Sequence, residues 1–286
     1  MIPVYNGAGY VGEAISSVLA QTLKPLECIV VDDGSTDATA AVVSEYGREV
    51  KYVYQENRGV SLARNRGAAE AVGDVLAFLD HDDAWLPHKL ERQLAELRNG
   101  EAMLVICAMS ITDASGVVTG ERRLRATGNL AAGMLMFDGT EVPSCSSTGV
   151  IWKNAFHQLG GFDLRLGTSA DWDLLFNAVI RGWLGYVDEP LVRYRVHGEN
   201  MSRSVPAMEH DMLYAYRKAF ADPRLPASLR DSRRRAYAQL YRMLSGSYNH
   251  AGDNRNALRT AVASLLNDPR PIAGEFRRFA SRGVRK

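Results

Sequence analysis

Val75-Leu-Ala-Phe-Leu79, followed at once by Asp80-His-Asp-Asp83, is the stretch that decides the fold. The first five residues are apolar on both faces, as a buried parallel strand must be, and the run ends abruptly in three carboxylates. In open α/β sheets, ligands bind beyond the carboxyl ends of the strands. The stretch therefore predicts a central strand with a binding site at its end.

Residues 1–110 alternate short apolar runs with longer amphipathic stretches, the pattern of βα units on a parallel sheet. We expect strands at 2–5, 27–31, 51–55, 75–79 and 103–109, and helices at 11–20, 36–45, 60–71 and 89–98. The fold class is therefore α/β, with a mostly parallel, Rossmann-like central sheet flanked by helices. The first expected strand begins where the chain begins and is shorter than usual, so we expect a few native N-terminal residues to be missing.

The later part of the chain divides near residue 202. Before it we expect a strand at 148–152, a short helix at 154–159 and a helix at 171–181, which complete one domain over 1–202 with halves of about 1–110 and 111–202. After it the strand signals vanish, and helical patterns at 208–220, 229–249 and 255–266 predict a helical appendage over 203–286. The last two helices resemble a single tetratricopeptide-type hairpin, an architecture that needs several stacked repeats.

The formal net charge of +1 hides an asymmetry between these parts. Residues 1–202 carry 17 Lys and Arg against 26 Asp and Glu, a net charge of −9, whereas residues 203–286 carry 17 against 7, a net charge of +10. A basic tail of this kind most often indicates a solvated helical face, and less often a surface for anionic lipid or nucleic acid. We expect no nucleic-acid partner.

Three cysteines without metal-ligand spacing indicate neither a disulfide framework nor a zinc site, which favours a reducing compartment. The longest nearly unbroken apolar run, at 102–109, is far shorter than the roughly 20 residues that span a bilayer. The N-terminus lacks a basic stretch followed by an apolar core. We therefore expect a cytoplasmic protein, with peripheral contact at the membrane face as an open alternative.

Gly7-Ala-Gly-Tyr-Val-Gly12 matches the dinucleotide fingerprint, and Asp32 follows at the distance needed to hold a ribose. This spacing alone would indicate a nicotinamide-dependent dehydrogenase. Pro3 and the step from Tyr5 to Asn6 interrupt the junction between strand and glycines, however, and hydride transfer has no use for the carboxylates at 80–83. We favour a plain turn into a helix.

Clustered carboxylates repel one another unless a cation or hydrogen-bond donors compensate their charge. Asp32 and Asp33 follow a second strand, and the parallel pattern places them at the same edge as Asp80 and Asp82. A hard divalent ion that also holds a diphosphate would compensate this charge, because Mg²⁺ prefers carboxylate and phosphate oxygens. For Asp83 we favour a simpler role as the cap of the helix that follows.

The ordered motifs at 2–6, 30–37, 57–59, 63–65 and 78–83 together resemble the donor half of the family 2 inverting glycosyltransferases, and the resemblance covers roughly residues 1–200. It implies the A-type glycosyltransferase fold, with the halves of the domain serving donor and acceptor. It also implies a nucleotide-sugar donor, and a donor-binding set of Pro3, Tyr5, Asp32, Asp33, Arg64 and Asp80.

Within that set, the resemblance implies that Tyr5 and Asp33 contact the base and that Asp80 lies near the ribose. It implies that Asp82 ligates the divalent metal, Mn²⁺ or Mg²⁺. Arg64 would face the nucleotide, whereas for Arg66 we favour a solvated helix surface.

A second group of motifs, at 160–163 and 169–173, resembles the acceptor segment of the same family, with Ala170 in place of the usual Glu. Asp171 aligns with the general base that deprotonates the acceptor hydroxyl. The run from Thr168 to Asp171 also fits a helix capping box, which would give Asp171 a structural role. His197 resembles the late histidine that completes the metal or diphosphate site, although a loop histidine is also a common surface residue.

These patterns predict a metal-dependent inverting glycosyltransferase that moves a sugar, with a UDP-sugar as the expected donor, to a hydroxyl acceptor in polysaccharide or glycan assembly. The acceptor stays open among lipid-linked, polysaccharide and protein glycans. The alternative is a non-catalytic nucleotide-sugar-binding or scaffold protein, suggested by Ala170 and by the helical tail. Basic residues of that tail could attach the protein to an anionic membrane; they are 233–235, 277, 278, 282, 285 and 286, beside the segment 272–284.

Overall fold

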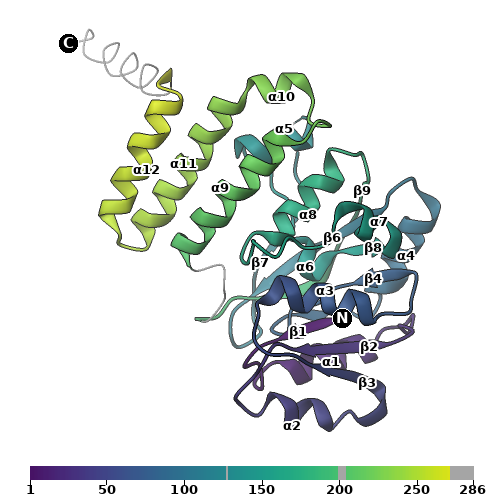
Figure 1. Cartoon of the computed structure of the whole chain (residues 1–286). Coiled ribbons are helices and arrows are strands. Elements are labelled where there is room, and N and C mark those ends of the chain that lie inside the picture. Colours follow the sequence, from purple (N-terminus) through teal and green to yellow (C-terminus); the bar gives the residue numbers. More distant parts are fainter. Residues whose placement is uncertain (127, 199–203, 271–286) are drawn as a thin grey trace.

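The computed structural model describes residues 1–126, 128–198 and 204–270 (Figure 1). Strands and helices form a layered α/β body, and the C-terminal helices extend from one side of it. The strands predicted within residues 1–110 and most of the predicted helices are present, with ends shifted by a few residues.

The N-terminal strands form a parallel sheet in the order β1 (Ile2–Val4), β2 (Cys28–Asp32) and β3 (Val50–Tyr54). Val4 pairs with Asp32, and Asp32 pairs with Tyr54. Every residue of β2 is buried, as the apolar run predicts for a central strand. The carboxyl ends of the three strands therefore lie level with one another.

A second, mixed sheet follows the order β4, β8, β6, β9 and β5, with β7 paired to β6. Its strands are β4 (Val75–Ala77), β5 (Ala84–Trp85), β6 (Leu104–Thr112), β7 (Val118–Arg122), β8 (Val150–Trp152) and β9 (Leu184–Arg195). β8 runs antiparallel between β4 and β6, so these two strands keep the predicted common direction without being neighbours.

Met1 joins the two sheets. Its nitrogen donates to the carbonyl of Ala77 at 2.9 Å, and its carbonyl accepts from the Leu79 amide at 3.0 Å. This alternation is the pattern of a parallel pair. The carboxyl end of β4, and with it Asp80, therefore lies beside the ends of β1 and β2.

Helices cover both faces of the sheets. β6 divides its side chains between two apolar clusters: Leu104 and Ile106 pack into one, and Val105 and Cys107 into the other. This alternation is the two-residue period of a strand buried on both sides. The helices around the sheets are α1 (Val11–Leu19), α2 (Thr39–Ser44), α3 (Val60–Glu70), α4 (Lys89–Asn99), α5 (Leu130–Met136), α6 (Cys145–Thr148), α7 (Lys153–Leu159) and α8 (Ala170–Val179).

The C-terminal helices are α9 (Val205–Ala221), α10 (Ala227–Asp231), α11 (Arg233–His250) and α12 (Asn254–Asn267). The helix predicted over 229–249 is thus interrupted at Ser232, and α11 and α12 form the predicted hairpin around Gly252, whose φ is +76°. α9 and α11 contribute to the same apolar cluster as α8. The buried Tyr216 of α9 also donates to the carbonyl of Leu135 at 2.8 Å. The domain boundary at residue 202 stays a prediction.

Three further predictions concern membrane spans, the cysteines and the basic tail. In the described ranges, none of the helices combines the length and the apolar character that a membrane span requires. Cys28, Cys107 and Cys145 are buried free thiols. The basic residues expected at 277, 278, 282, 285 and 286, and the segment 272–284, lie outside the described residues.

Candidate functional site

Asp32 ends β2 and is buried at the edge of the sheet. Its carboxylate accepts hydrogen bonds from the Ser35 amide at 2.8 Å and from the Tyr52 hydroxyl at 2.6 Å. Burial, followed by the hydrogen bond to Asp32, raises the pKa of Tyr52 well above its usual range. Tyr52 therefore stays a neutral donor that fixes the Asp32 carboxylate.

Asp33, the next residue, holds the loop that leads into α3. Its carboxylate accepts from the amides of Arg58 at 3.0 Å and Gly59 at 2.8 Å, and from the Gln55 side chain at 2.7 Å. Gly59 has φ of +93°, a left-handed conformation that favours glycine. The bonds of Asp33 explain why this loop keeps its shape.

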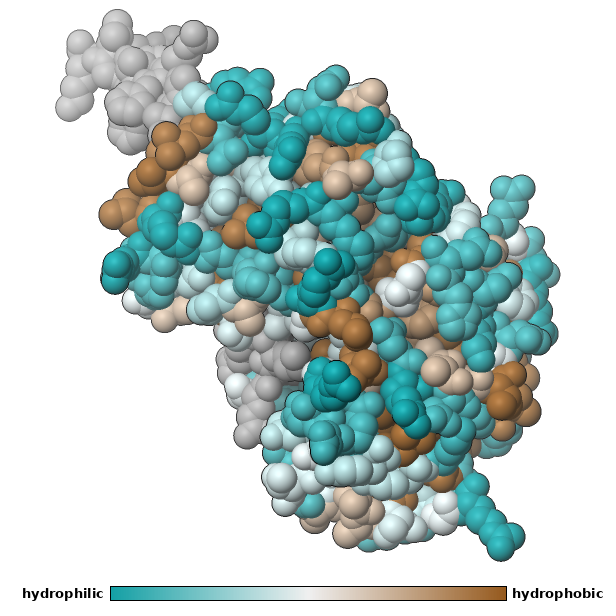
Figure 2. Space-filling model, viewed as in Figure 1, coloured by the Kyte–Doolittle hydropathy of each residue, from teal (hydrophilic) through white to brown (hydrophobic). Residues whose placement is uncertain are grey.

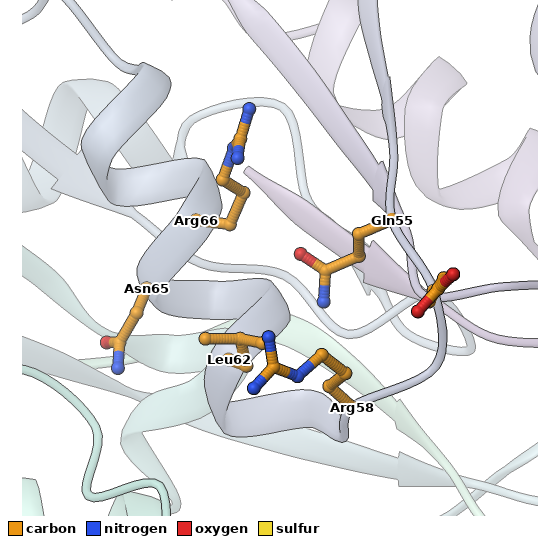
Figure 3. A pocket seen from close by; sticks show the side chains of 6 residues that line it. Gln55, Arg58, Leu62, Asn65 and Arg66 are labelled. Carbon is orange, nitrogen blue, oxygen red and sulfur yellow. The ribbon is translucent and has the colours of Figure 1, made fainter.

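An open hollow of about 460 Å³ lies beside this loop (Figure 3). It is lined by Gln55, Glu56, Arg58, Leu62, Asn65 and Arg66. None of the predicted donor-binding residues lines it, and Gln55 and Arg58 connect it to Asp33. Arg66 is half exposed and pairs with Glu70 at 2.8 Å, which confirms its predicted place on the helix surface.

In the turn after β1, the amides of Gly7 and Ala8 are hydrogen-bonded within the protein. The Gly7 amide donates to the Thr39 hydroxyl at 2.9 Å, and the Ala8 amide donates to Asp37 at 3.1 Å. A Cβ on Gly7 would lie 2.4 Å from Cδ2 of His81, so this glycine is needed for close packing. The turn therefore serves the packing of the 80–83 loop, and the dinucleotide interpretation is not supported.

Arg64 and Asp80 form an ion pair at 2.6 Å. Burial alone would lower the pKa of Arg64, but the Asp80 carboxylate outweighs this effect and raises it, with a smaller contribution from Asp171. Burial alone would raise the pKa of Asp80, but Arg64 keeps it below its usual range. The guanidinium lies 5.1 Å from the Phe162 ring centroid, and its Nε has no hydrogen-bond partner among the described residues. The pair is therefore charged and held rigidly.

Asp82 and His197 meet although 115 positions separate them in the sequence. Nε2 of His197 lies 2.9 Å from an Asp82 carboxylate oxygen, and the imidazole stacks on Tyr10 with centroids 4.9 Å apart. The side chains are only 8% and 15% exposed, so His197 is not an ordinary surface histidine. In the described part of the chain no three His, Cys, Asp or Glu residues cluster as a metal site. One imidazole and one carboxylate nevertheless fit a divalent ion whose other ligands are phosphate and water oxygens.

Ser147 of α6 links the carboxylates that follow β4. Its hydroxyl accepts from the Asp80 amide at 3.1 Å and donates to Asp83 at 2.5 Å, while Asp83 also accepts from the Arg195 amide at 3.0 Å. Burial, with the neighbouring Asp82 and Asp80, raises the pKa of Asp83 well above its usual range. The predicted capping role of Asp83 is wrong, because α4 begins after His88 without a side-chain cap.

Asp171 lies in the first turn of α8, where its carboxylate accepts a short hydrogen bond from the Ser144 hydroxyl. The capping-box alternative is wrong. The N-cap of α8 is Ser169, which makes no side-chain cap bond, and Thr168 bonds instead to Asp211 at 3.0 Å. Because Asp211 holds the start of α8, the Asp171 carboxylate does not cap the helix and instead accepts the hydrogen bond from Ser144.

Ser144 and Ser147 are the site residues that sequence reasoning missed. They belong to a turn, Ser144–Thr148, that contacts Asp171 at one end and Asp80 and Asp83 at the other. We call these five residues the serine turn. Its signal in the sequence is a run of small polar residues between Pro143 and Gly149, whose residues 145–148 are all buried.

The remaining predicted residues lie along β1 and α8. Pro3 is buried opposite Val31 of β2, and Tyr5, just beyond β1, is 47% exposed. Ala170, which stands where the resemblance implies Glu, is fully buried in the apolar core. The structure thus brings Arg64 to Asp80, Asp82 to His197, and Asp171 to the serine turn. The side-chain hydrogen bonds of Asp32 and Asp33 described above are instead made with residues between β2 and α3.

The two sheets covered by helices on both faces, with acidic residues at the carboxyl edge, have the architecture of the A-type glycosyltransferase fold. The chain belongs to glycosyl transferase family 2, whose family model matches residues 1–160. It is 34% identical over 204 residues to a Rickettsia typhi protein described as an uncharacterized glycosyltransferase, covering 69% of this chain and 63% of that protein. It is 39% identical over 114 residues to TuaG of Bacillus subtilis, a putative teichuronic acid biosynthesis glycosyltransferase, covering 38% and 43%.

The chain spans 31% of the length of another relative, from Rickettsia bellii, so such relatives contain further sequence. Solved structures share the fold. TarS 1–349 of S. aureus in complex with UDP-GlcNAc matches with a TM-score of 0.64 at 14% identity, over 93% of this chain and 90% of that one. The mannosyltransferase PcManGT of Pyrobaculum calidifontis in complex with GDP-Man and Mn²⁺ matches with a TM-score of 0.61 at 20% identity, over 100% and 79%.

Proposed function

We propose that this chain transfers a sugar, with inversion, from a nucleotide-diphosphate sugar to a hydroxyl acceptor in glycan or polysaccharide assembly. The observation that carries the proposal is the serine turn, which holds Asp171 at one end and Asp80 and Asp83 at the other. A displacement reaction needs its base and its leaving-group site at a fixed separation, and one rigid turn that contacts both supplies it.

On the donor side, Tyr5 and Asp33 would bind the base, Asp32 and Pro3 would shape that pocket, and Asp80 would receive the ribose. The ion pair with Arg64 keeps Asp80 charged and therefore an acceptor for sugar hydroxyls. UDP-GlcNAc and GDP-Man are bound by two proteins that share this fold, which supports the donor class. UDP is our proposed nucleotide.

For the cofactor, we propose a divalent metal, Mn²⁺ or Mg²⁺, held by Asp82 and His197. When bound, such an ion would offset the negative charge that grows on the departing diphosphate. Asp82 and His197 already meet from distant parts of the chain, and Tyr10 stacks on the imidazole and orients it. The PcManGT complex contains Mn²⁺, which supports the choice of a divalent ion.

In the chemical step, the acceptor oxygen forms a bond to the anomeric carbon while the bond from that carbon to the diphosphate oxygen breaks. The proton of the acceptor hydroxyl passes to the Asp171 carboxylate. Ser144 donates to one carboxylate oxygen of Asp171, so the other oxygen is oriented to take the proton. The displacement takes place from the face opposite the leaving group, which gives inversion.

The second candidate is a non-catalytic nucleotide-sugar-binding or scaffold protein, which the buried Ala170 favours because no glutamate assists Asp171 there. We further propose that the protein works in the cytoplasm, with reversible contact at the membrane face.

Incubation with a panel of nucleotide sugars and Mn²⁺ separates the two candidates. We expect one donor, a UDP-sugar, to raise the melting temperature only when metal is present and to release nucleoside diphosphate. Metal-dependent binding without any release, across donors and simple hydroxyl acceptors, would favour the scaffold protein.

A further inference from the structure

A second hollow, of about 370 Å³, opens between α9 and α11 near the end of α12. It is lined by Leu213, Arg217, Arg233, Arg234, Tyr237, Tyr241 and Asn267. Three guanidinium groups therefore face one open space, and no carboxylate is among the lining residues that the structure describes. We call it the arginine hollow.

Other arginines of the C-terminal helices differ from those of the hollow, because they form ion pairs with carboxylates. Arg224 pairs with Asp222 at 2.7 Å, Arg259 with Glu209 at 2.5 Å and Arg270 with Asp268 at 2.8 Å. In the described ranges, the three arginines of the hollow have no such ion pair, and Arg234 donates to the Leu266 carbonyl at 3.2 Å. Several cations that line one hollow favour an anion between them.

The guanidinium groups are also oriented for an anion. Arg233 packs 5.6 Å from the Tyr237 ring centroid, and Arg217 packs 5.8 Å from that of Tyr214. A guanidinium packed on an aromatic ring keeps its N–H edge available for a planar, two-bond contact with an oxyanion. The Tyr237 hydroxyl is buried beside Arg233: burial raises its pKa, and the neighbouring guanidinium has the opposite effect.

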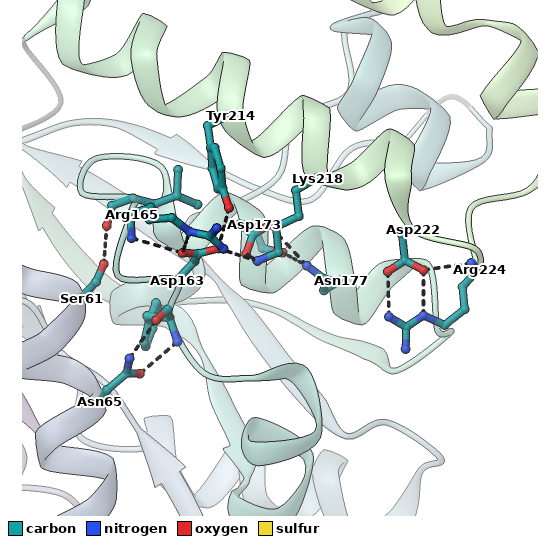
Figure 4. A network of polar contacts seen from close by, with 12 residues as sticks. Ser61, Asn65, Asp163, Arg165, Asp173, Asn177, Tyr214, Lys218, Asp222 and Arg224 are labelled. Atoms are coloured by element: carbon teal, nitrogen blue, oxygen red, sulfur yellow. Dashed lines mark hydrogen bonds and ion pairs between the residues drawn. The ribbon is translucent and has the colours of Figure 1, made fainter.

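α9 also carries Lys218, which contacts α8 and the loop before it (Figure 4). Lys218, next to Arg217, donates to Asp163 at 3.1 Å and to Asp173 at 2.6 Å. Asp173 lies two positions after Asp171 in α8. α9 therefore carries Arg217, which lines the hollow, and Lys218, which forms a salt bridge with α8, the helix that contains Asp171.

An unbroken line of cations and rings crosses the same helix. The Tyr214 ring has Arg165 at 4.7 Å on the loop before α8 and Arg217 at 5.8 Å on the hollow side. These contacts place two arginines beside the Tyr214 ring, one from the loop before α8 and one from the hollow.

We propose that the arginine hollow binds a phosphate group of the acceptor, so that the acceptor is a glycan carrying a phosphodiester or a diphosphate. This inference rests on the proposed transferase function and names its substrate class. Phosphate fits better than carboxylate because it offers more acceptor oxygens to a set of guanidinium, hydroxyl and amide donors. It fits better than a lipid surface because the cations line a concave space instead of a flat face.

The test is calorimetric titration of the metal-free full-length protein with inorganic pyrophosphate. We expect the Arg217→Gln/Arg234→Gln variant to bind about tenfold more weakly than the unmodified protein, because two charge-assisted contacts are lost. Arg242→Gln, an exposed arginine of the same helix outside the hollow, should bind as the unmodified protein does. Equal pyrophosphate affinity in the double variant overturns the proposal.

Two further arms separate other anions. Tricarballylate, a tricarboxylate, should bind clearly more weakly than pyrophosphate, and equal binding would overturn the phosphate assignment. Co-sedimentation with phosphatidylcholine vesicles containing phosphatidylglycerol should be the same for the double variant and the unmodified protein. Loss of vesicle binding in that variant, with pyrophosphate binding intact, would assign these arginines to a membrane and overturn the proposal.

Donor turnover by the unmodified protein is measured separately, with UDP-sugars and Mn²⁺. Absent turnover with pyrophosphate binding at the hollow would reject the transferase proposal while leaving an anion site. Turnover without pyrophosphate binding would reject the hollow alone.

Discussion

At the residue scale, the proposed transferase function depends most on Asp171, the residue that we propose as the general base. Its carboxylate accepts a hydrogen bond from Ser144, and the start of α8 is held by Asp211, which accepts from the Thr168 hydroxyl and the Ser169 amide. A change at Asp171 should therefore affect catalysis without unfolding the helix.

We predict that Asp171→Asn lowers turnover by about 10²- to 10⁴-fold, because the amide still accepts from Ser144 but cannot take the proton. UDP affinity and melting temperature should stay close to those of the unmodified protein. Steady-state kinetics would check this, with the exposed Asp231→Asn as control. Near-normal turnover of Asp171→Asn would remove Asp171 as the base.

Lys89 is a buried cation without a counterion contact in the described structure. Its side chain is fully buried, Nζ has no hydrogen-bond partner among the described residues, and it lies 4.2 Å from the Trp85 ring centroid. Burial lowers the pKa of Lys89 to about 8. Below that pH both the folded and the unfolded chain carry the proton, so the folded protein bears the full cost of the buried charge.

We predict that Lys89→Met raises the free energy of unfolding by about 2 kcal/mol near neutral pH, after allowing for the lost contact with Trp85. The gain should shrink as pH rises above 8, because the native lysine then loses its proton while the unfolded one keeps it up to about pH 10. Denaturant unfolding of both proteins across this range measures it. A Lys89→Met variant that is less stable than the unmodified protein at every pH would contradict the account.

At the scale of elements, the serine turn links Asp171 with the carboxylates that follow β4. It comprises the N-cap Ser144 and the four buried residues of α6. Its side chains contact Asp171 through Ser144, and Asp83 through Ser147.

We predict that Ser144→Ala lowers kcat about tenfold while the KM for the donor and the affinity for UDP change little, because only the orientation of Asp171 is lost. Ser144→Thr keeps the hydroxyl and should restore most of the activity, which a purely structural role would not require. A fall in UDP affinity equal to the fall in kcat would show that the turn acts through the donor site instead.

The helices and strands also show how much of the fold could be predicted from the sequence. Strands β1, β2 and β4 could be predicted because they are short apolar runs in the sequence. Helix α3 could be predicted from Gly59 at its start, and helix α4 from Gly100 at its end. β9 escaped prediction because its residues are mostly half buried, contain Pro190 and pair with β6 through irregular register. The serine turn escaped because hydrogen bonds between segments far apart in sequence leave no periodic pattern. The roles of the predicted site residues stay predictions.

At the scale of the whole molecule, charge and apolar surface gather on the C-terminal helices. Residues 203–286 carry a net charge of +10. α12 exposes Leu258, Val262 and Leu266 at four-residue spacing, and Figure 2 shows apolar atoms along this edge of the molecule. Cations beside exposed aliphatic side chains are typical of reversible attachment to a membrane surface.

We predict that the chain co-sediments with vesicles that contain anionic lipid through its basic residues after Pro269, because each cation near such a surface contributes about 1 kcal/mol. Binding should weaken as salt is added and should vanish on truncation after Pro269. Equal association with neutral and anionic vesicles, or with neither, would rule out the electrostatic attachment and leave the charges as a solvated helical face.

The most direct test of a metal-dependent donor site is calorimetry of UDP binding to the full-length protein, with and without Mn²⁺. Asp82 and His197 would hold the ion between the protein and the diphosphate, so chelation should abolish UDP binding. Asp82→Asn should weaken it strongly even when Mn²⁺ is present, whereas Asp231→Asn should not. UDP that binds equally well in the presence and absence of divalent metal would contradict the account.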